Sequence, residues 1–541
     1  MLWIALHLPS LSLESFEATL AGRPAAAGTE VHAGDGGAGT AAGAGSDSAT
    51  PAPIALIDAH RIVAGNAVAQ ALGVRPGLKR ATALALAPQL VLGQADAARD
   101  AAALLPVAHA ALAFTPQVVI ARAGHPFDDA HTVLLEVEAS LRYFGGLERL
   151  LQRLGRALAP LGHVVHCATA PTAQGAALLA RQHPDCHCAD DAALQRALDE
   201  LPVWRLGAGR EHRDALQAMG LRTLGDLRAL PRAGLARRFG EALLAELDAA
   251  LGTRPDPRVP LALPATFESR LELFARADTT EQLLHGAAVL LARLVAWLSA
   301  QHAFVRRFTL VMQHETRWRR SSATPAESVL EIALAEPSRD REHLLVLLRE
   351  RLARIELPAP TLDLRLAAAD IARRAAPNSE LFPTARSEVE GLTRLIERLQ
   401  ARLGAAQVQR LAPLDEHRPE RASALQAVDA ARVERLVKAP RAAGSSIAGA
   451  AGAARRPVWL LPEPQPLPER QSRPFLDGSP LQLLSGPERI ETGWWDCSLA
   501  ERDYFIAQNG DGALVWIYRA RLPLETDGEP RQGWFMQGRF G

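Results

Sequence analysis

The chain has 541 residues, 48% of them hydrophobic, and its 60 Lys and Arg residues balance its 60 Asp and Glu residues. The length predicts roughly three to four domains. The charge balance excludes an overall field that would attract the whole protein to nucleic acid or to an acidic membrane, so any DNA affinity depends on local patches. Four cysteines do not form a disulfide framework in a chain of this length, and no apolar run approaches the ~20 residues of a membrane span. We therefore expect a cytoplasmic protein without a membrane segment.

Residues 1–170 alternate strands and helices. Residues 1–8 predict a short buried strand, and a polar helix begins near Ser10. Residues 21–53 contain almost no large apolar side chain, so we expect a disordered insertion there. Beyond it we expect helical structure over 67–86 and strands at PQVVIA, TVLLEVEAS and HVVHCATA. This alternation is typical of an α/β or α+β domain.

Residues 171–258 are predicted to be mostly helical and contain the most specific local pattern of the chain. The segment LPVWRLGAGREHRDALQAMGLRTLGDLRALP, which begins at Leu201, has the form of a helix-hairpin-helix element. Gly207 and Gly209 free the backbone so that its N–H groups, with a helix start behind them, can bind a DNA phosphate. Arg210 follows as a further DNA contact. The alternative is an ordinary helical pair joined by a glycine turn.

Residues 262–375 show the order strand, helix, strand, strand, helix, strand, which is that of a ferredoxin-like domain. Arg306 and Arg307 lie together on the second of these strands. Because neighbouring side chains of a strand point to opposite faces, we expect only one of the two to reach DNA. The arginines over residues 317–320 are equally well explained by a solvated hairpin tip.

The rest of the chain predicts a linker region and a C-terminal module. Residues 376–457 contain one predicted helix, Glu388 to Leu403, and end in a Gly- and Ala-rich stretch, 442–457, that is typical of a flexible linker. Residues 458–541 are rich in Trp and predict a small β-rich module. Most of its aromatic residues must form its core, and we expect exposed ones to bind protein partners.

Three segments resemble the Y family of translesion DNA polymerases. They are GVRPGLKRATALALAPQL from Gly73, FTPQV from Phe114 and VLLEVEASLRYFGG from Val133. The resemblance extends to about residue 375. It implies a multidomain α+β fold with palm and fingers over residues 1–170, a helix-hairpin-helix thumb over 171–258 and a ferredoxin-like little finger over 262–375.

The resemblance also identifies residues that this chain lacks. Y-family polymerases hold two Mg²⁺ ions with an Asp in the first strand and an Asp-Glu pair in a later strand, because the ions activate the 3′-hydroxyl and neutralise the triphosphate. If Glu14 and Glu136 match the family's other acidic positions, the three metal positions fall on Ala5, His131 and Thr132. This implies no bound metal, no cofactor and no nucleotidyl transfer.

The alternative is an active Y-family polymerase that uses displaced carboxylates. Asp58, Asp128 and Asp129 are the nearby candidates, although residues 1–13 contain no acidic side chain. A group of His and Cys residues over 183–188 does not predict a zinc site, because adjacent ligands rarely converge without a second, distant pair.

The start MLWIALHLPSLSLE and the tryptophan-rich ending from Gly486 are similar to the ImuB family, whose members have a Y-family body with an emptied metal site. The resemblance implies a non-catalytic adaptor in translesion synthesis and damage-induced SOS mutagenesis, acting at the nucleoid. It implies four partners: DNA, the replication sliding clamp, the RecA-like protein ImuA and an error-prone C-family DNA polymerase. A general DNA-binding protein without partners is a further alternative.

The peptide Asn378-Ser-Glu-Leu381-Phe382 resembles the clamp-binding peptide Q-x-x-L-F, with Asn in place of Gln. Pro377 and Pro383 flank it and keep it out of a helix, as an extended docking peptide requires. Asn378, Leu381 and Phe382 are thus the expected clamp contacts. The alternative is that Leu381 and Phe382 pack on the preceding domain.

Overall fold

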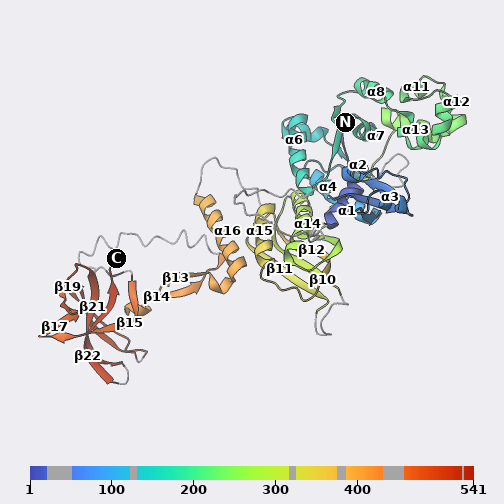
Figure 1. Cartoon of the computed structure of the whole chain (residues 1–541). Coiled ribbons are helices and arrows are strands. Elements are labelled where there is room, and N and C mark those ends of the chain that lie inside the picture. Colours follow the sequence, from blue (N-terminus) through green and yellow to red (C-terminus); the bar gives the residue numbers. More distant parts are fainter. Residues whose placement is uncertain are drawn as a thin grey trace. The chain divides into compact units, whose positions relative to one another are not determined.

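A computed structural model describes residues 1–20, 52–121, 131–315, 325–373, 385–430, 456–457, 459–496, 498–526 and 529–540 (Figure 1). The chain divides into an N-terminal unit, Met1–Ser379, and a C-terminal unit, Glu380–Gly541. Residues 21–51 of the predicted insertion, the basic segment 317–320 and the clamp peptide around Asn378 lie outside the described residues, as does most of the predicted linker.

The first sheet of the N-terminal unit has the order β5-β6-β1-β7-β8. The predicted first strand is confirmed as β1, which lies at the centre and pairs antiparallel with β6 and with β7. The other predicted strands, PQVVIA, TVLLEVEAS and HVVHCATA, are confirmed as β5, β6 and β7. The bounds are β1 Trp3–His7, β5 Val118–Ile120, β6 Thr132–Glu136, β7 His166–Ala170 and β8 Cys186–His187.

Helices cover both faces of this sheet. Ile4 and Leu6 of β1 pack on one face with α4 and α6, whereas Ala5 packs on the other face with α7. Asp96 caps the start of α4 by accepting from the amides of Ala98 and Arg99. The bounds are α1 Leu11–Leu20, α4 Ala97–Leu112, α5 Glu138–Phe144, α6 Leu147–Leu158, the 3₁₀ turn Ala159–Leu161 and α7 Ala173–Gln182.

A small sheet of order β3-β2-β4 lies beside α1. The helical structure expected over residues 67–86 consists of two short helices, because Gly73 and Gly77 between them have positive φ angles of 86° and 90°. Gly93 of β4 has no room for a side chain, since a Cβ there would lie 2.5 Å from the Phe16 ring. The bounds are β2 Ile54–Asp58, β3 Arg61–Gly65, α2 Ala67–Ala71, α3 Arg80–Leu86 and β4 Val91–Gln94.

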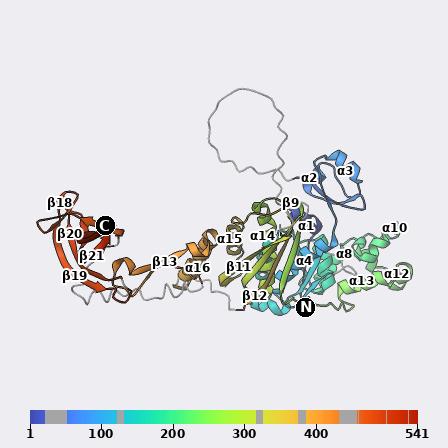
Figure 2. The ribbon, with the colours of Figure 1, turned by 90° about the horizontal axis from the view of Figure 1, so that it is seen from below.

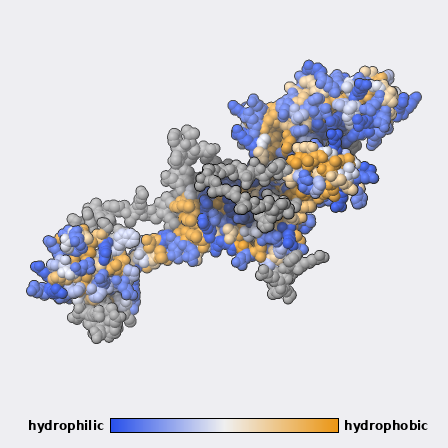
Figure 3. All heavy atoms as spheres, in the orientation of Figure 1, coloured by the Kyte–Doolittle hydropathy of each residue, from blue (hydrophilic) through white to orange (hydrophobic). Residues whose placement is uncertain are grey.

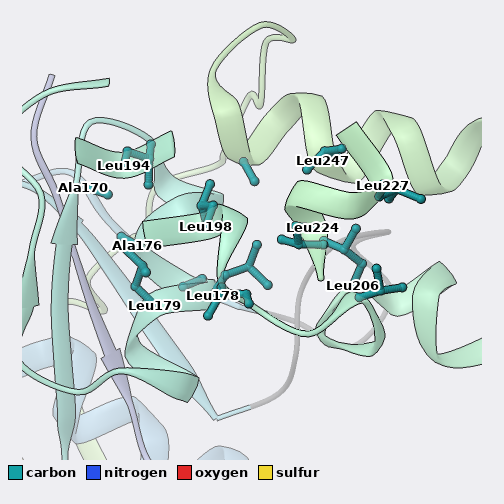
Figure 4. Packing of buried hydrophobic residues seen from close by; sticks show 14 of the residues in the cluster. Ala170, Ala176, Leu178, Leu179, Leu194, Leu198, Leu206, Leu224, Leu227 and Leu247 are labelled. Carbon is teal, nitrogen blue, oxygen red and sulfur yellow. The ribbon is translucent and has the colours of Figure 1, made fainter. Parts of the chain in front are cut away.

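The helical region predicted after residue 171 is confirmed. Its short helices share a leucine-rich core with α7, and Figure 4 shows Leu198, Leu224 and Leu247 pointing toward one another from different helices. The bounds are α8 Asp191–Asp199, the 3₁₀ turn Val203–Arg205, α9 Gly207–Glu211, α10 Arg213–Ala218, α11 Leu224–Arg228, α12 Arg232–Phe239 and α13 Glu241–Leu251.

The second sheet confirms the predicted β-α-β-β-α-β order of elements. Its strands lie in the order β11-β10-β12-β9, so β12 separates β9 from β10. In a ferredoxin-like sheet the first and third strands are central, whereas here the second and fourth are, so the ferredoxin-like prediction is wrong in strand order. The order of elements along a chain does not determine which strand fills the gap in a split βαβ unit. The bounds are β9 Phe267–Ala277, α14 Thr280–Ala300, β10 Phe304–His314, β11 Glu327–Ser338, α15 Arg341–Leu352 and β12 Thr361–Ala372.

Helix α14 lies beside α1 and α4 (Figures 1 and 2). It begins with a capping box in which Thr279 and Gln282 satisfy each other's backbone amides. Among the described residues it alone has the length and hydropathy of a membrane span, contrary to the sequence-based expectation, but 61% of that window is buried in the N-terminal unit. Ala296 joins the core of the first sheet, and Phe274 of β9 meets Phe16 edge-to-face at 5.0 Å between ring centroids.

In the C-terminal unit, the predicted helix is confirmed as α16, Ala385–Leu403, and it precedes a hairpin, β13–β14, that was not predicted. The β-rich prediction is confirmed by a sheet of order β15-β22-β21-β20-β19. Tyr504, Trp516 and Tyr518 are buried in its core, with Tyr504 and Trp516 stacked at 4.2 Å. The bounds are β13 Gln409–Pro413, β14 Ser423–Ala427, β15 Trp459–Leu467, β16 Glu469–Arg470, β17 Arg473–Leu476, β18 Ser479–Pro480, β19 Gln482–Thr492, β20 Ala500–Gln508, β21 Leu514–Thr526 and β22 Glu529–Arg539.

Trp297 of α14 is fully buried and donates from Nε1 to the Pro264 carbonyl at 3.1 Å. We predict that Trp297→Ala lowers the free energy of unfolding of the N-terminal unit by about 3–5 kcal/mol, because a large cavity opens in the core. Chemical denaturation followed by near-ultraviolet circular dichroism measures this change. Trp297→Phe retains an aromatic ring and should lower the free energy of unfolding by less. Equal stability of Trp297→Ala and Trp297→Phe would contradict the predicted packing role.

Candidate functional site

The first candidate site lies where β1 ends beside the start of β6. The strand register pairs Ala5 with Leu134 and His7 with Thr132. Ala5 is fully buried and packs with Leu134 in the apolar core. Ala5 and His7 are two residues apart on β1, so both side chains lie on the sheet face that Leu134 and Thr132 share. His7 is the residue directly opposite Thr132, and Ala5 as the first emptied metal position stays a prediction.

The side chains at this strand end are a threonine and two histidines. The imidazole Nδ1 of His7 lies 3.1 Å from the Thr132 hydroxyl, and the ring of His166 on β7 is 6.4 Å from that of His7 between centroids. Mg²⁺ prefers anionic oxygen ligands, which a hydroxyl and imidazoles do not supply. In the part of the chain that the structure describes, no three His, Cys, Asp or Glu side chains are grouped so that they could hold a metal ion.

Asp100 of α4 is a nearby carboxylate that the sequence analysis did not single out. Its oxygens accept hydrogen bonds from the hydroxyls of Ser12 and Ser15, the latter at 2.9 Å, and His131 Nε2 lies 3.6 Å from Oδ2. Burial alone would raise the pKa of Asp100, but the hydrogen bonds from His131, Ser12 and Ser15 outweigh it and lower the pKa. The fold thus stabilises the charged form of Asp100 with hydrogen bonds from its own side chains.

The other candidate carboxylates do not meet at the strand end. Asp58 is exposed at the end of β2, in the small sheet. Asp128 and Asp129 lie outside the described residues. The structure therefore brings the predicted positions His131 and Thr132 together with His7 and Asp100. The only signal for Asp100 in the sequence was an acidic residue within an apolar helix.

The predicted phosphate-binding glycines have internal partners. The amide of Gly207 donates to Oε2 of Glu246 on α13 at 2.7 Å. Gly209 is buried, and a Cβ at this position would overlap the carbonyl oxygen of Val203. The Gly207 amide thus has a partner within the fold, and Gly209 permits close packing of α9 against the preceding turn. DNA binding by the two glycines stays a prediction.

The Glu246 carboxylate thus lies at the start of α9, where a DNA phosphate was expected to bind. It is buried, and it also accepts a hydrogen bond from Nε2 of Gln174 at 3.2 Å. Burial raises its pKa to about 7, against the opposing effects of the Gly207 amide and of Arg181 and Arg210. Arg210 itself is exposed on α9, so it is the member of the predicted group that faces solvent.

Arg306 and Arg307 on β10 are both exposed. The register of β10 shifts between Val305 and Arg307, as in a β-bulge, so the regular alternation on which the expectation of opposite faces was based is interrupted at Arg306. Arg307 forms an ion pair with Glu331 at 3.0 Å between Nη1 and Oε1.

Two further ion pairs lie on the same sheet. Arg270 contacts Asp363 at 2.6 Å and Arg365 contacts Glu268 at 3.5 Å. Carboxylates therefore compete with DNA phosphates for several arginines of the second sheet.

The sequence of the chain was compared with those of known proteins. No family model matches the chain. Protein ImuB of Caulobacter vibrioides strain NA1000 / CB15N is 31% identical over 489 residues, which cover 87% of this chain and 100% of the relative. Protein ImuB of strain ATCC 19089 / CIP 103742 / CB 15 matches with the same identity and coverage. The chain belongs to the ImuB family.

Solved polymerase structures are similar to this ImuB-family chain at low identity. The insertion ternary complex of Dbh DNA polymerase is 16% identical to this chain, with a TM-score of 0.36. The match covers 69% of this chain and 99% of the Dbh chain. DinB from Sulfolobus solfataricus is 16% identical with a TM-score of 0.35 and the same coverage.

We predict that the buried Glu246 makes the ImuB-family chain less stable as pH rises. Its folded-state pKa of about 7 lies above the ordinary 4.5, so the folded protein binds more protons than the unfolded chain between these values. Stability is then lost as pH increases across this interval, by about 3 kcal/mol at most. Glu246→Gln should abolish this loss, as measured by denaturant midpoints at about pH 5 and about pH 8.

Glu241→Gln is the matched control, since Glu241 is exposed at the start of the same helix. It should leave the pH dependence unchanged. A Glu246→Gln protein with the same pH dependence as the original would refute the assignment.

Proposed function

We propose that this ImuB-family chain is a non-catalytic adaptor in translesion synthesis and damage-induced mutagenesis, acting in the cytoplasm at the nucleoid. The observation that supports the proposal is the chemistry at the end of β1, where His7 hydrogen-bonds Thr132 and His131 lies beside Asp100. The family resemblance implies that a Y-family polymerase has carboxylates at the positions of Ala5, His131 and Thr132 to hold two Mg²⁺ ions.

The proposal is based on the lack of negatively charged side chains that could bind magnesium at this strand end. Two magnesium ions beside a triphosphate require several anionic ligands that converge from different strands. His7, His131 and Thr132 supply none. Within the described residues, the carboxylate beside them is Asp100, which already accepts from Ser12 and Ser15. An active polymerase with displaced carboxylates is the second candidate, and Asp128 and Asp129 keep it open to test.

In this proposal DNA binding is sequence-independent and modest. Arg210, Arg306 and Arg307 are exposed cations, and arginine contacts to phosphates supply affinity without reading sequence. The ion pair of Arg307 with Glu331 must break before the guanidinium can bind a phosphate. A modest affinity for DNA is sufficient for a protein that other proteins hold at the replication site.

The sliding clamp is the proposed tether. The peptide with Asn378, Leu381 and Phe382 lies in sequence between β12, which ends at Ala372, and α16, which begins at Ala385. The family resemblance supports clamp binding by the aliphatic-aromatic pair, with Asn378 as the polar anchor. In the sequence, this peptide spans the boundary between the two units.

The C-terminal unit is the proposed docking site for ImuA and the C-family polymerase. Trp494 and Trp495 are 78% and 54% exposed in the loop between β19 and β20. Trp side chains on a rigid support are frequent energetic hot spots of protein interfaces. These two are therefore the proposed anchors.

The loop that carries these tryptophans is firmly held. Asp496 accepts two hydrogen bonds from the guanidinium of Arg418, at 3.1 and 2.6 Å, and a third from the Ser498 amide at 3.2 Å. Gly493 has a φ of 85°, and a Cβ there would overlap the carbonyl oxygen of Ser498. Little conformational freedom remains to be lost on binding, which favours affinity.

A second apolar surface lies on α16. Four leucines at helical spacing are 36–52% exposed, and Figure 3 shows hydrophobic residues over the part of the chain where Figure 1 labels α16. They are Leu392, Leu395, Leu399 and Leu403. An amphipathic helix of this kind fits the groove of a protein partner.

We predict that the purified chain binds primer–template DNA and does not extend the primer with Mg²⁺ or Mn²⁺ and deoxynucleoside triphosphates. Denaturing gel electrophoresis of a labelled primer measures extension, and fluorescence anisotropy confirms that the same preparation binds the DNA. In Arg306→Ala/Arg307→Ala, affinity should fall, and the dependence of log K on log salt should weaken by about 1 per lost phosphate contact. Primer extension by the purified chain would overturn the adaptor proposal in favour of displaced carboxylates.

We predict that two double variants lose different binding partners. Leu381→Ala/Phe382→Ala should lose the clamp and retain ImuA and the C-family polymerase, whereas Trp494→Ala/Trp495→Ala should retain the clamp and lose ImuA, the polymerase or both. Pull-down with each purified partner measures binding. If both variants bind all three partners as the original chain does, the proposed docking sites are wrong.

A further inference from the structure

A cavity of about 450 Å³ lies within the N-terminal unit between the first sheet's helices and α14. One wall consists of residues from α1, α4 and the turn 160–163, and the opposite wall consists of α14 and the first residue of α15. Figures 1 and 2 show α14 beside α1 and α4. A volume of this size is typical of small-molecule sites, and none of the functions above uses it.

Arg293 on α14 is the most unusual residue of the cavity. Only 5% of it is exposed, and its Nη1 donates to neutral acceptors alone, the Ser269 hydroxyl at 3.2 Å and the Arg270 carbonyl at 3.3 Å. Burial lowers its pKa to about 10, and no described carboxylate pairs with it. A buried guanidinium without a counter-ion is costly, so an anion in the cavity would stabilise it.

Two further nitrogen-bearing side chains line the same wall. Arg341 lies at the start of α15, and its Nε is buried without a hydrogen-bond partner. His285 lies two turns before Arg293 on α14, and burial lowers its pKa. Two guanidinium groups and an imidazole on one wall provide donors from several directions, which is how proteins bind a phosphate.

The opposite wall carries acidic groups from α1. Glu14 contacts His163, with 3.0 Å between Oε2 and Nδ1. Burial and the charge of Glu14 raise the pKa of Glu17, which lines the cavity as well. A polyphosphate that extended to this wall would be repelled, whereas an amino group would find an acceptor there.

We propose that this cavity binds a phosphorylated small molecule of mononucleotide size, with its phosphate against Arg293 and Arg341 and a hydrogen-bond donor toward Glu17. The phosphate supplies the counter-charge that Arg293 lacks. The rest of the ligand fills space that an inorganic ion leaves empty. Because the two walls belong to the first sheet's helices and to the second sheet's helix, a bound ligand would bridge them.

Isothermal titration calorimetry of the full chain tests the proposal with three probes: 2′-deoxyadenosine monophosphate, inorganic phosphate and deoxyadenosine. The monophosphate should bind at one saturable site, phosphate should compete with it, and deoxyadenosine should not bind. Phosphate should bind more weakly than the monophosphate; equal affinity of the two would assign the site to an inorganic anion and overturn the mononucleotide proposal. Equal binding of deoxyadenosine would overturn the role of the arginines.

Variants locate the site. Arg341→Gln should weaken monophosphate binding by about tenfold, since a charge-assisted hydrogen bond is lost. Arg349→Gln makes the same change on the exposed side of the same helix and should bind as the original chain does. Arg293→Lys provides a second test at the buried position. If Arg341→Gln binds with unchanged affinity, or if no probe binds at millimolar concentrations, the cavity is not the proposed site.

Discussion

The pairing of β1 between β6 and β7 is the constraint on which the rest of the N-terminal unit depends. A central strand has both faces covered, which is why Ile4 and Leu6 serve one core while Ala5 serves the other. The same register sets His7 opposite Thr132 and opposite His166. A shift of one residue would exchange the two faces, so the composition of the strand fixes which side chains meet at its end.

Charged side chains at the candidate sites have partners within the fold. Asp100 accepts from two serine hydroxyls, Glu246 accepts from the Gly207 amide, and Arg307 pairs with Glu331. A DNA phosphate would have to replace such a partner at Gly207 and at Arg307.

The order of elements was largely predictable from the sequence, because alternating and helical hydrophobic patterns are local. Helix α16, the strands of the first sheet and the β-α-β-β-α-β order of the second sheet all followed from such patterns. Strand order, the bulge beside Arg307 and the hairpin β13–β14 did not, since they depend on pairings between distant segments.

The candidate sites were predicted less completely, for the same reason. The sequence identified His131 and Thr132, but His7 emerged only from the register, and Glu246 reaches Gly207 from 39 residues away. No pattern within a short window reveals such a partner. Arg293 is a further example, because its lack of a counter-ion depends on what surrounds α14 in three dimensions.

The contacts of α14 with the first sheet bear on how the N-terminal unit unfolds. Ala296 belongs to the core of the first sheet, and Phe274 rests on Phe16, whose ring also fills the space left by Gly93. The first and second sheets are therefore joined by shared apolar packing through α14 and α1. Heat or denaturant should melt them cooperatively in a single transition, and a protease that cuts the backbone between them should release no independently folded fragment.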